Sequence, residues 1–284
     1  MYAKLYGATL HGIDGCIITV EVDISQGLPV FDMVGLPNQS VKEARERVRA
    51  AIKNSGYDFP MRRIVVNLAP ATIRKSSAGL DLAIALGVLV ASGQIKGRKA
   101  NISALLNRCL FMGELALDGS LLPTFGTLAM SLAGLEANYS TIYTSVENGN
   151  NLKAIPNLTI YGESSLQNII TILEDQVKSK SKSISTSQKV KIGKNQDGIL
   201  TNTMDNKNHN TTYDKDFGDV QGQELGKRAM LISAAGHHHC IMIGPPGGGK
   251  TMMAERLPTI LPPMTWNEMV EVSRIQDVIG LLGD

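Results

Sequence analysis

The segment CIMIGPPGGGKT, residues 240–251, decides the fold expected for the carboxyl-terminal part of this chain. Residues 244–251 match the pattern G-x-x-x-x-G-K-[ST] at every specified position. The apolar run Cys240–Ile243 predicts a buried strand before this loop, and Lys250–Leu257 predicts a helix that Pro258 ends. A strand, a glycine-rich loop and a helix in this order are typical of a P-loop nucleotide-binding domain.

The composition of the loop suits phosphate binding. Its glycines permit a turn in which consecutive backbone N–H groups point at one phosphate. Lys250 is predicted to reach the β- and γ-phosphates of ATP, and the Thr251 hydroxyl to contact Mg²⁺. A glycine-rich turn with an accidental Lys-Thr pair is the alternative. The predicted nucleotide-binding residues are Gly244, Pro245, Pro246, Gly247, Gly248, Gly249, Lys250 and Thr251.

Hydrolysis would need more than this loop. A P-loop ATPase holds its Mg²⁺ with a carboxylate at the end of a second apolar strand. The sequence after Thr251 shows no such strand, because Glu271 and Asp277 fall within or beside a helical pattern. We therefore assign no catalytic residue, expect no ATP hydrolysis by this chain alone, and interpret the chain as a fragment or a truncated product.

The preceding sequence alternates between strand and helix patterns, which predicts a mixed α/β domain. Gly15–Asp23 and the run at 28–35 are expected to form a hairpin, and Ser40 with Glu43 forms a capping box for a helix that ends at Asn54. Further strands are predicted at Ile64–Leu68, Phe111–Leu117, Leu121–Leu122, Thr141–Thr144 and Leu158–Tyr161. Further helices are predicted at Leu80–Ala91, Thr127–Ala137, Leu166–Leu173, Gln223–Ala235 and from Trp266.

Length and composition divide the chain. At 284 residues it exceeds a typical domain of roughly 100–200 residues. Residues 177–216 are rich in Ser, Lys and Asn and poor in large apolar residues, which is typical of a flexible linker. We predict an amino-terminal domain at 1–172, a polar linker at 173–216 and an incomplete P-loop domain at 217–284. A net charge of +2 is too small to indicate a nucleic-acid or membrane partner by itself.

The cysteines and the apolar runs exclude other classes of protein. Cys16, Cys109 and Cys240 lie far apart without CxxC spacing, which excludes a disulfide scaffold and favours the reducing cytoplasm. The most apolar stretch, Leu80–Ala91, is too short to span a bilayer, and the first residues lack a signal-peptide pattern. We expect no membrane association.

Several motifs in a fixed order resemble the magnesium-chelatase-like AAA+ ATPases of the YifB/ComM competence-protein family. The resemblance covers everything except the linker. One departure is Gly248, where the family usually has Ser. The similar segments are Val34–Pro37, Glu43–Ala51, Val66–Pro70, Gly113–Gly119, Asp219–Gln223, Lys227–Ala229, the loop at 244–251 and Leu257–Pro263.

The resemblance implies a fold and a function. It implies an amino-terminal α/β domain like ribosomal S5 domain 2, which the Lon protease domain shares, followed by the first part of an AAA+ domain. It also implies binding of ATP and Mg²⁺, with the adenine near Val220 and Gly222. Complete members of the family are expected to form homo-oligomeric rings that remodel branched DNA in natural transformation. The alternative within the resemblance is an ATPase subunit of the chelatase type, which inserts Mg²⁺ into a tetrapyrrole.

Two other motifs suggest rival sites. Ser77-Ala78-Gly79 resembles the nucleophile segment of Lon-like proteases, but the corresponding lysine position is Leu128, so Ser76 or Ser77 is preferred as a helix N-cap. His237, His238 and His239 are adjacent, so in an extended segment they cannot all point at one metal ion. We interpret them as the entry to the P-loop strand.

Basic residues of the amino-terminal domain form a third candidate. Their spacing of three and four along one predicted helix would make a basic stripe that could contact phosphates. Nearby glutamates favour an ordinary solvated face instead. The residues of the stripe are Lys42, Arg45, Arg49 and Lys53, and further basic residues of the domain are Arg62, Arg63, Arg74 and Lys75.

Overall fold

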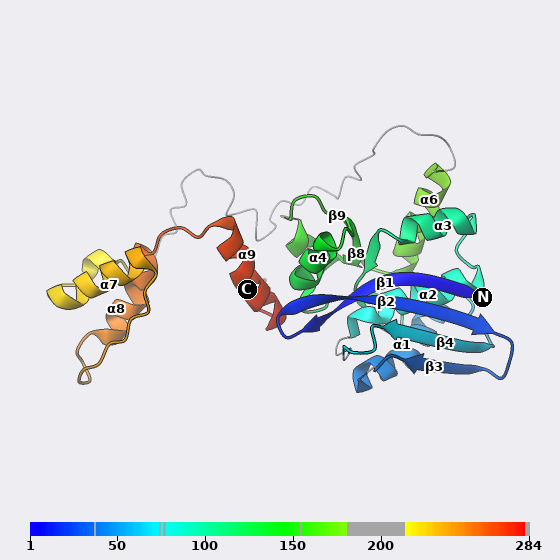
Figure 1. Cartoon of the computed structure of the whole chain (residues 1–284), viewed down its shortest axis with the longest axis horizontal. Coiled ribbons are helices and arrows are strands. Elements are labelled where there is room, and N and C mark those ends of the chain that lie inside the picture. Colours follow the sequence, from blue (N-terminus) through cyan, green and yellow to red (C-terminus); the bar gives the residue numbers. More distant parts are fainter. Residues whose placement is uncertain (37, 74, 76–77, 154, 181–213, 282–284) are drawn as a thin grey trace. The chain divides into compact units, whose positions relative to one another are not determined.

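The structure is a computed structural model that describes residues 1–36, 38–73, 75, 78–153, 155–180 and 214–281. Its contacts divide the chain into two units (Figure 1). The first unit is Met1–Asp205 together with Val272–Asp284, and the second is Asn206–Glu271. No helix among the described residues is long and apolar enough to cross a membrane.

The first unit is built on a four-stranded sheet of order β1-β2-β4-β3. β1 (Tyr2–His11) and β2 (Asp14–Ser25) form an antiparallel hairpin, and β4 (Arg63–Ala69) lies antiparallel to β2. β3 (Val30–Val34) pairs with β4 in parallel. The hairpin predicted between β2 and β3 is therefore wrong, because β1 and β4 already occupy the two edges of β2.

Two helices cover this sheet with apolar side chains. α1 (Gln39–Asn54) starts at Gln39, so the capping box predicted at Ser40 does not lie at its start. α2 (Asp81–Ser92) follows the short helix η1 (Ala78–Leu80) and is buried almost all round, as its sequence predicts. A Cβ at Gly87 of α2 would collide with the Val22 side chain, so this glycine lets the helix approach β2 closely.

A second, parallel sheet completes the first unit. Its strands have the order β5-β8-β9, with β5 at Cys109–Phe111, β8 at Thr141–Ser145 and β9 at Thr159–Glu163. The hairpin predicted around Asp118-Gly119 is confirmed by β6 (Glu114–Leu115) and β7 (Leu121–Leu122). The remaining helices of this part are α3 (Lys99–Leu106), α4 (Thr127–Glu136), α5 (Val146–Leu152) and α6 (Leu166–Lys180).

Helix α6 is longer than its sequence pattern predicts. It continues to Lys180, past the expected start of the linker at residue 173. The cause is burial, because Leu173 and Val177 both pack into the core at 2% exposure. Most of the predicted linker, residues 181–213, lies outside the described residues.

The second unit contains short helices around a small apolar cluster. Its helical elements are η3 (Phe217–Asp219), α7 (Glu224–Gly236), α8 (Lys250–Arg256), η4 (Leu257–Ile260) and the start of α9 (Trp266–Val278). The helices predicted from Gln223, Lys250 and Trp266 are thus confirmed. The buried cluster consists of Phe217, Val220, Met230 and Met253.

The buried strand predicted at Cys240–Ile243 is wrong. Among the described residues this segment has no strand partner, and Ile241 and Ile243 are 84% and 90% exposed. A strand forms only where a neighbour accepts and donates its backbone hydrogen bonds. The apolar composition of this run therefore does not by itself produce a strand.

Candidate functional site

The glycine-rich loop folds as a tight turn in front of α8. Gly247 and Gly249 have φ angles of +78° and +75°, which lie in the left-handed region that side chains disfavour. The backbone N–H of Gly248 donates to the Pro245 carbonyl over 3.3 Å. Gly249 then serves as the N-cap residue of α8. Glycine is thus required at two of the predicted positions by the backbone conformation alone.

Lys250 lies back over the loop that precedes it. Its Nζ donates hydrogen bonds to the carbonyl oxygens of Gly244 and Pro245, over 2.8 and 2.7 Å. The next residue, Thr251, is exposed in the first turn of α8. The structure therefore brings the predicted loop residues and the ammonium group together.

The residues predicted to lie near the adenine have different surroundings. Val220 is 3% exposed and belongs to the same apolar cluster as Met253, two residues beyond Thr251. Gly222 is exposed in the turn before α7, with a φ of +67°. Val220 therefore has a packing role next to α8, whereas the surroundings of Gly222 leave it accessible.

The rival motifs do not assemble into sites among the described residues. Ser76 and Ser77 lie outside those residues, and Leu128, at the position expected for a protease lysine, is 1% exposed in an apolar cluster. His237 caps the end of α7, and no group of three metal-ligating side chains occurs in the described part of the chain. These histidines therefore form no metal site there.

Lys75 does not belong to a phosphate-binding surface. Its side chain is fully buried, and its Nζ donates to the backbone carbonyls of Gly35 and Pro70. Burial lowers the pKa of the Lys75 ammonium group. The expectation that this lysine could contact phosphates is therefore wrong, because its side chain is fully buried and a phosphate in solvent cannot reach it. Arg74 and the side chain of Lys42 lie outside what the structure describes.

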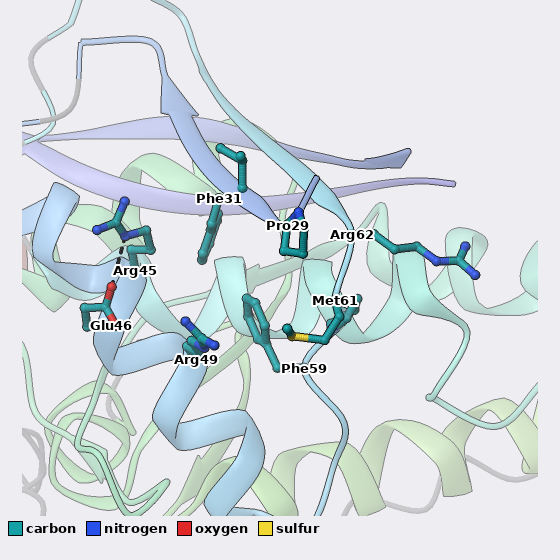
Figure 2. Close-up of a pocket in the computed structure, with 10 residues that line it drawn as sticks. Pro29, Phe31, Arg45, Glu46, Arg49, Phe59, Met61 and Arg62 are labelled. Carbon is teal, nitrogen blue, oxygen red and sulfur yellow. Dashed lines mark hydrogen bonds and ion pairs between the residues drawn. The ribbon is translucent and has the colours of Figure 1, made fainter. Parts of the chain in front are cut away.

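A pocket of about 290 Å³ gathers three of the predicted basic residues. It lies where the start of β3, α1 and the segment entering β4 meet, because the parallel register places Val30 opposite Arg63. Figure 2 shows arginine, aromatic and methionine side chains around it. The lining residues are Pro29, Val30, Phe31, Arg45, Glu46, Arg49, Phe59, Pro60, Met61 and Arg62.

Sequence reasoning missed this pocket, although it identified its arginines. The Arg49 guanidinium carbon lies 5.7 Å from the centroid of the Phe59 ring, a cation–π distance. The Phe31 and Phe59 ring centroids are also 5.7 Å apart. No local sequence pattern indicates this pocket, because residues 29–31 and 59–62 meet only through the pairing of β3 with β4.

A buried ion pair joins α1 to the start of α2 and was also missed. Arg47 donates from Nε to Asp81 Oδ2 over 2.7 Å and from Nη2 to Asp81 Oδ1 over 3.2 Å. Asp81 is 1% exposed, and burial raises its pKa to about 6 although the hydrogen bonds from Arg47 act in the opposite direction. This pair holds the start of α2 against α1.

Comparison with known proteins covers both units. Residues 20–148 match the family described as "Subunit ChlI of Mg-chelatase", and residues 216–284 match "Magnesium chelatase, subunit ChlI". The uncharacterized protein YifB of Salmonella typhimurium is 38% identical over 269 residues, 95% of this chain and 48% of YifB. Competence protein ComM of Haemophilus influenzae is 34% identical over 277 residues, 98% of this chain and 50% of ComM.

A more distant similarity concerns about half of the chain. Lon protease of Mycolicibacterium smegmatis is 26% identical over 158 residues, which are 53% of this chain and 19% of that protease. The chain spans about half the length of the YifB and ComM proteins that it matches.

Proposed function

The chain belongs to the magnesium-chelatase ChlI-like family of YifB and ComM, and we propose that it is an ATP-binding AAA+ protein that acts in DNA remodelling. The loop at 244–251 carries the proposal, since it combines a full P-loop pattern with two left-handed glycines and a lysine folded over the loop. The match of residues 216–284 to the chelatase family supports the same assignment.

The residues present fit a nucleotide phosphate with Mg²⁺. Lys250 would exchange its two carbonyl acceptors for β- and γ-phosphate oxygens, and backbone N–H groups of the loop would bind the same phosphates. The Thr251 hydroxyl would contact Mg²⁺, which neutralises phosphate charge when bound. We assign no catalytic residue, because the described residues after Thr251 contain no strand that ends in a carboxylate.

The finer parts of the proposal follow from the relatives. We propose that the amino-terminal domain has the S5-domain-2-like fold of Lon, which the similarity to Lon protease supports. We also propose the domain bounds 1–172, 173–216 and 217–284, cytoplasmic localisation, and a ring of identical subunits for the complete protein. DNA as partner is supported by the likeness to a competence protein.

A second candidate is an ATPase subunit of the magnesium-chelatase type. The names of the two matching families favour it. Two assays on the full-length protein separate these functions. Stimulation of its ATPase activity by branched DNA supports remodelling. Insertion of Mg²⁺ into a tetrapyrrole in the presence of partner subunits supports the chelatase.

Nucleotide binding by this chain tests the loop directly. A fluorescent ATP analogue with Mg²⁺ is titrated with the unchanged chain, with Lys250→Ala and with Lys215→Ala. Lys215 is the matched control, because it is an exposed lysine of the same unit that pairs with Glu255. We expect Lys250→Ala to weaken binding at least tenfold and Lys215→Ala to leave it unchanged. Equal affinity of all three proteins would contradict the assignment.

A further inference from the structure

The pocket beside β3 exposes apolar side chains within a basic rim. Phe31 is 9% exposed and forms part of the core, whereas Val30 and Met61 are 43% and 65% exposed. Large apolar side chains in contact with water usually mark a binding surface when they gather beside a cavity. The volume of about 290 Å³ lies near the lower end for small-ligand pockets, so one planar group with its linker fills it.

The charge of the lining is positive. The lining contains three arginines and one acidic residue, Glu46. Glu46 pairs with Arg45 over 3.1 Å. Arg45 and Glu46 are both more than half exposed, so solvent weakens their pairing and an anion can replace it. In the view of Figure 2, Arg45 and Arg62 lie on opposite sides of Phe59 and Met61. A ligand that suits the rim therefore carries more than one negative charge.

Arg49 and Phe59 provide a surface for a flat group. The Arg49 guanidinium lies over the Phe59 ring, and Arg49 is an exposed residue, so solvent and a planar ligand can reach it. Arginine planes and aromatic rings are the surfaces on which unpaired nucleobases stack. Stacking of this kind does not depend on base identity.

We propose that this pocket binds one nucleotide of single-stranded DNA, with its base against Arg49, Phe59 and Met61 and the adjoining phosphates at Arg45 and Arg62. The inference rests on the proposed function, for which it supplies a DNA contact outside the P-loop. A single strand fits better than a duplex because the base must leave its stack to enter the pocket. An acidic peptide matches the charge but offers no base to stack on Arg49.

Fluorescence anisotropy with the full 284-residue chain tests the pocket. The probe is a labelled oligothymidine of about 15 nucleotides, without ATP, over a series of salt concentrations. The pocket variant is Arg45→Gln with Arg62→Gln. The control is Arg98→Gln with Arg108→Gln, two exposed arginines of the same unit that do not line the pocket, so both variants lose the same charge.

We expect the pocket variant to bind at least fivefold more weakly, and its slope of log affinity against log salt to fall by about 0.7 for each lost phosphate contact. The control should keep both values. Met61→Asp, at an exposed position, should weaken binding without affecting folding, since it replaces an apolar contact of the base with an anion. Equal weakening by both double variants would overturn the proposal.

Two further probes complete the test. A duplex of the same length should bind more weakly than the single strand, and a polyglutamate peptide at equal charge should not displace the oligonucleotide. Duplex binding as tight as single-strand binding, or displacement by the peptide, would overturn the proposal. ATP binding is measured separately. If the unchanged chain does not bind ATP, the proposed function is refuted. If the pocket variant binds DNA as tightly as the unchanged chain, this inference is refuted.

Discussion

Ile142 and Ile243 lie in apolar runs of equal length, 141–144 and 240–243, and each run predicts a strand. Ile142 is 0% exposed in the middle of a parallel sheet, opposite Leu110 on one side and Ile160 on the other. Ile243 is 90% exposed, and its run has no strand partner among the described residues. A segment whose composition predicts a strand therefore forms one only where a distant segment pairs with it.

The difference extends to the two units. The first unit has strands paired into sheets under α1, α2 and α4, so its apolar residues share large buried clusters. The buried cluster described for the second unit has only Phe217, Val220, Met230 and Met253. Because burial of one large apolar side chain stabilises by about 1.5–3 kcal/mol, we expect the first unit to unfold cooperatively and the second to be far less stable.

The largest expected effect is that of Ile142→Ala. Removing a fully buried aliphatic side chain should lower the free energy of unfolding of the first unit by about 2–5 kcal/mol, through lost burial and the cavity left behind. Urea denaturation followed by near-ultraviolet circular dichroism measures it, because Tyr143 stacks between Phe111 and Tyr161 beside this residue. A loss below about 1 kcal/mol would show that the sheet around β8 is less tightly packed than described.

Arg47→Met should have the next largest effect, about 3 kcal/mol at pH 8, because it leaves the buried Asp81 carboxylate without its partner. Burial raises the Asp81 pKa from 3.8 to about 6 in the folded protein. The folded state therefore binds a proton at Asp81 more tightly than the unfolded state does. The contribution of Asp81 to stability decreases as the pH rises from 3.8 to about 6. Loss of Arg47 raises the pKa further, so the destabilisation should shrink towards pH 4.5.

Urea denaturation at several pH values measures this dependence. The control is Lys215→Met, which breaks the exposed pair of Lys215 with Glu255 in the second unit. Solvent screens that pair, so we expect no measurable change at any pH. A pH-independent loss in Arg47→Met would contradict the assignment to Asp81.

The smallest expected effect is that of Ile243→Ala. An exposed side chain without packed neighbours contributes little, so the change in stability should stay within about 0.5 kcal/mol. Fluorescence of Trp266, the only tryptophan of the chain, measures it, because this residue belongs to the second unit. A destabilisation comparable to that of Ile142→Ala would mean that residues 240–243 are buried in solution, and the contrast between the two runs would fail.

Local patterns predict much of the fold and fail where pairing is non-local. Helical periodicity identifies α1, a long apolar run identifies α2, and the Asp-Gly signal identifies the hairpin of β6 and β7. β1 escapes recognition because its apolar positions include small residues such as Gly7 and Ala8. The parallel pairing of β3 with β4 has no local signal, since the two strands are separated by the whole of α1.

The candidate sites follow the same division. The nucleotide-binding loop is one continuous segment, so its sequence predicts it, and the structure brings Lys250 to its carbonyls. The basic pocket combines Pro29–Phe31, one face of α1 and Phe59–Arg62. Its arginines can be identified along the chain, but their position around Phe59 depends on the strand register. Lys75 is expected at the surface but is buried. No local sequence pattern distinguishes a buried lysine from an exposed one.

The hydrogen bonds of Lys250 to Gly244 and Pro245 turn nucleotide binding into a competition. The loop's own carbonyls act as an intramolecular ligand for the ammonium group, and phosphate gains that group only in the fraction of molecules where it has been released. The apparent affinity is the intrinsic affinity multiplied by that fraction. Any neighbouring element that drew these carbonyls away would therefore tighten nucleotide binding without touching the nucleotide.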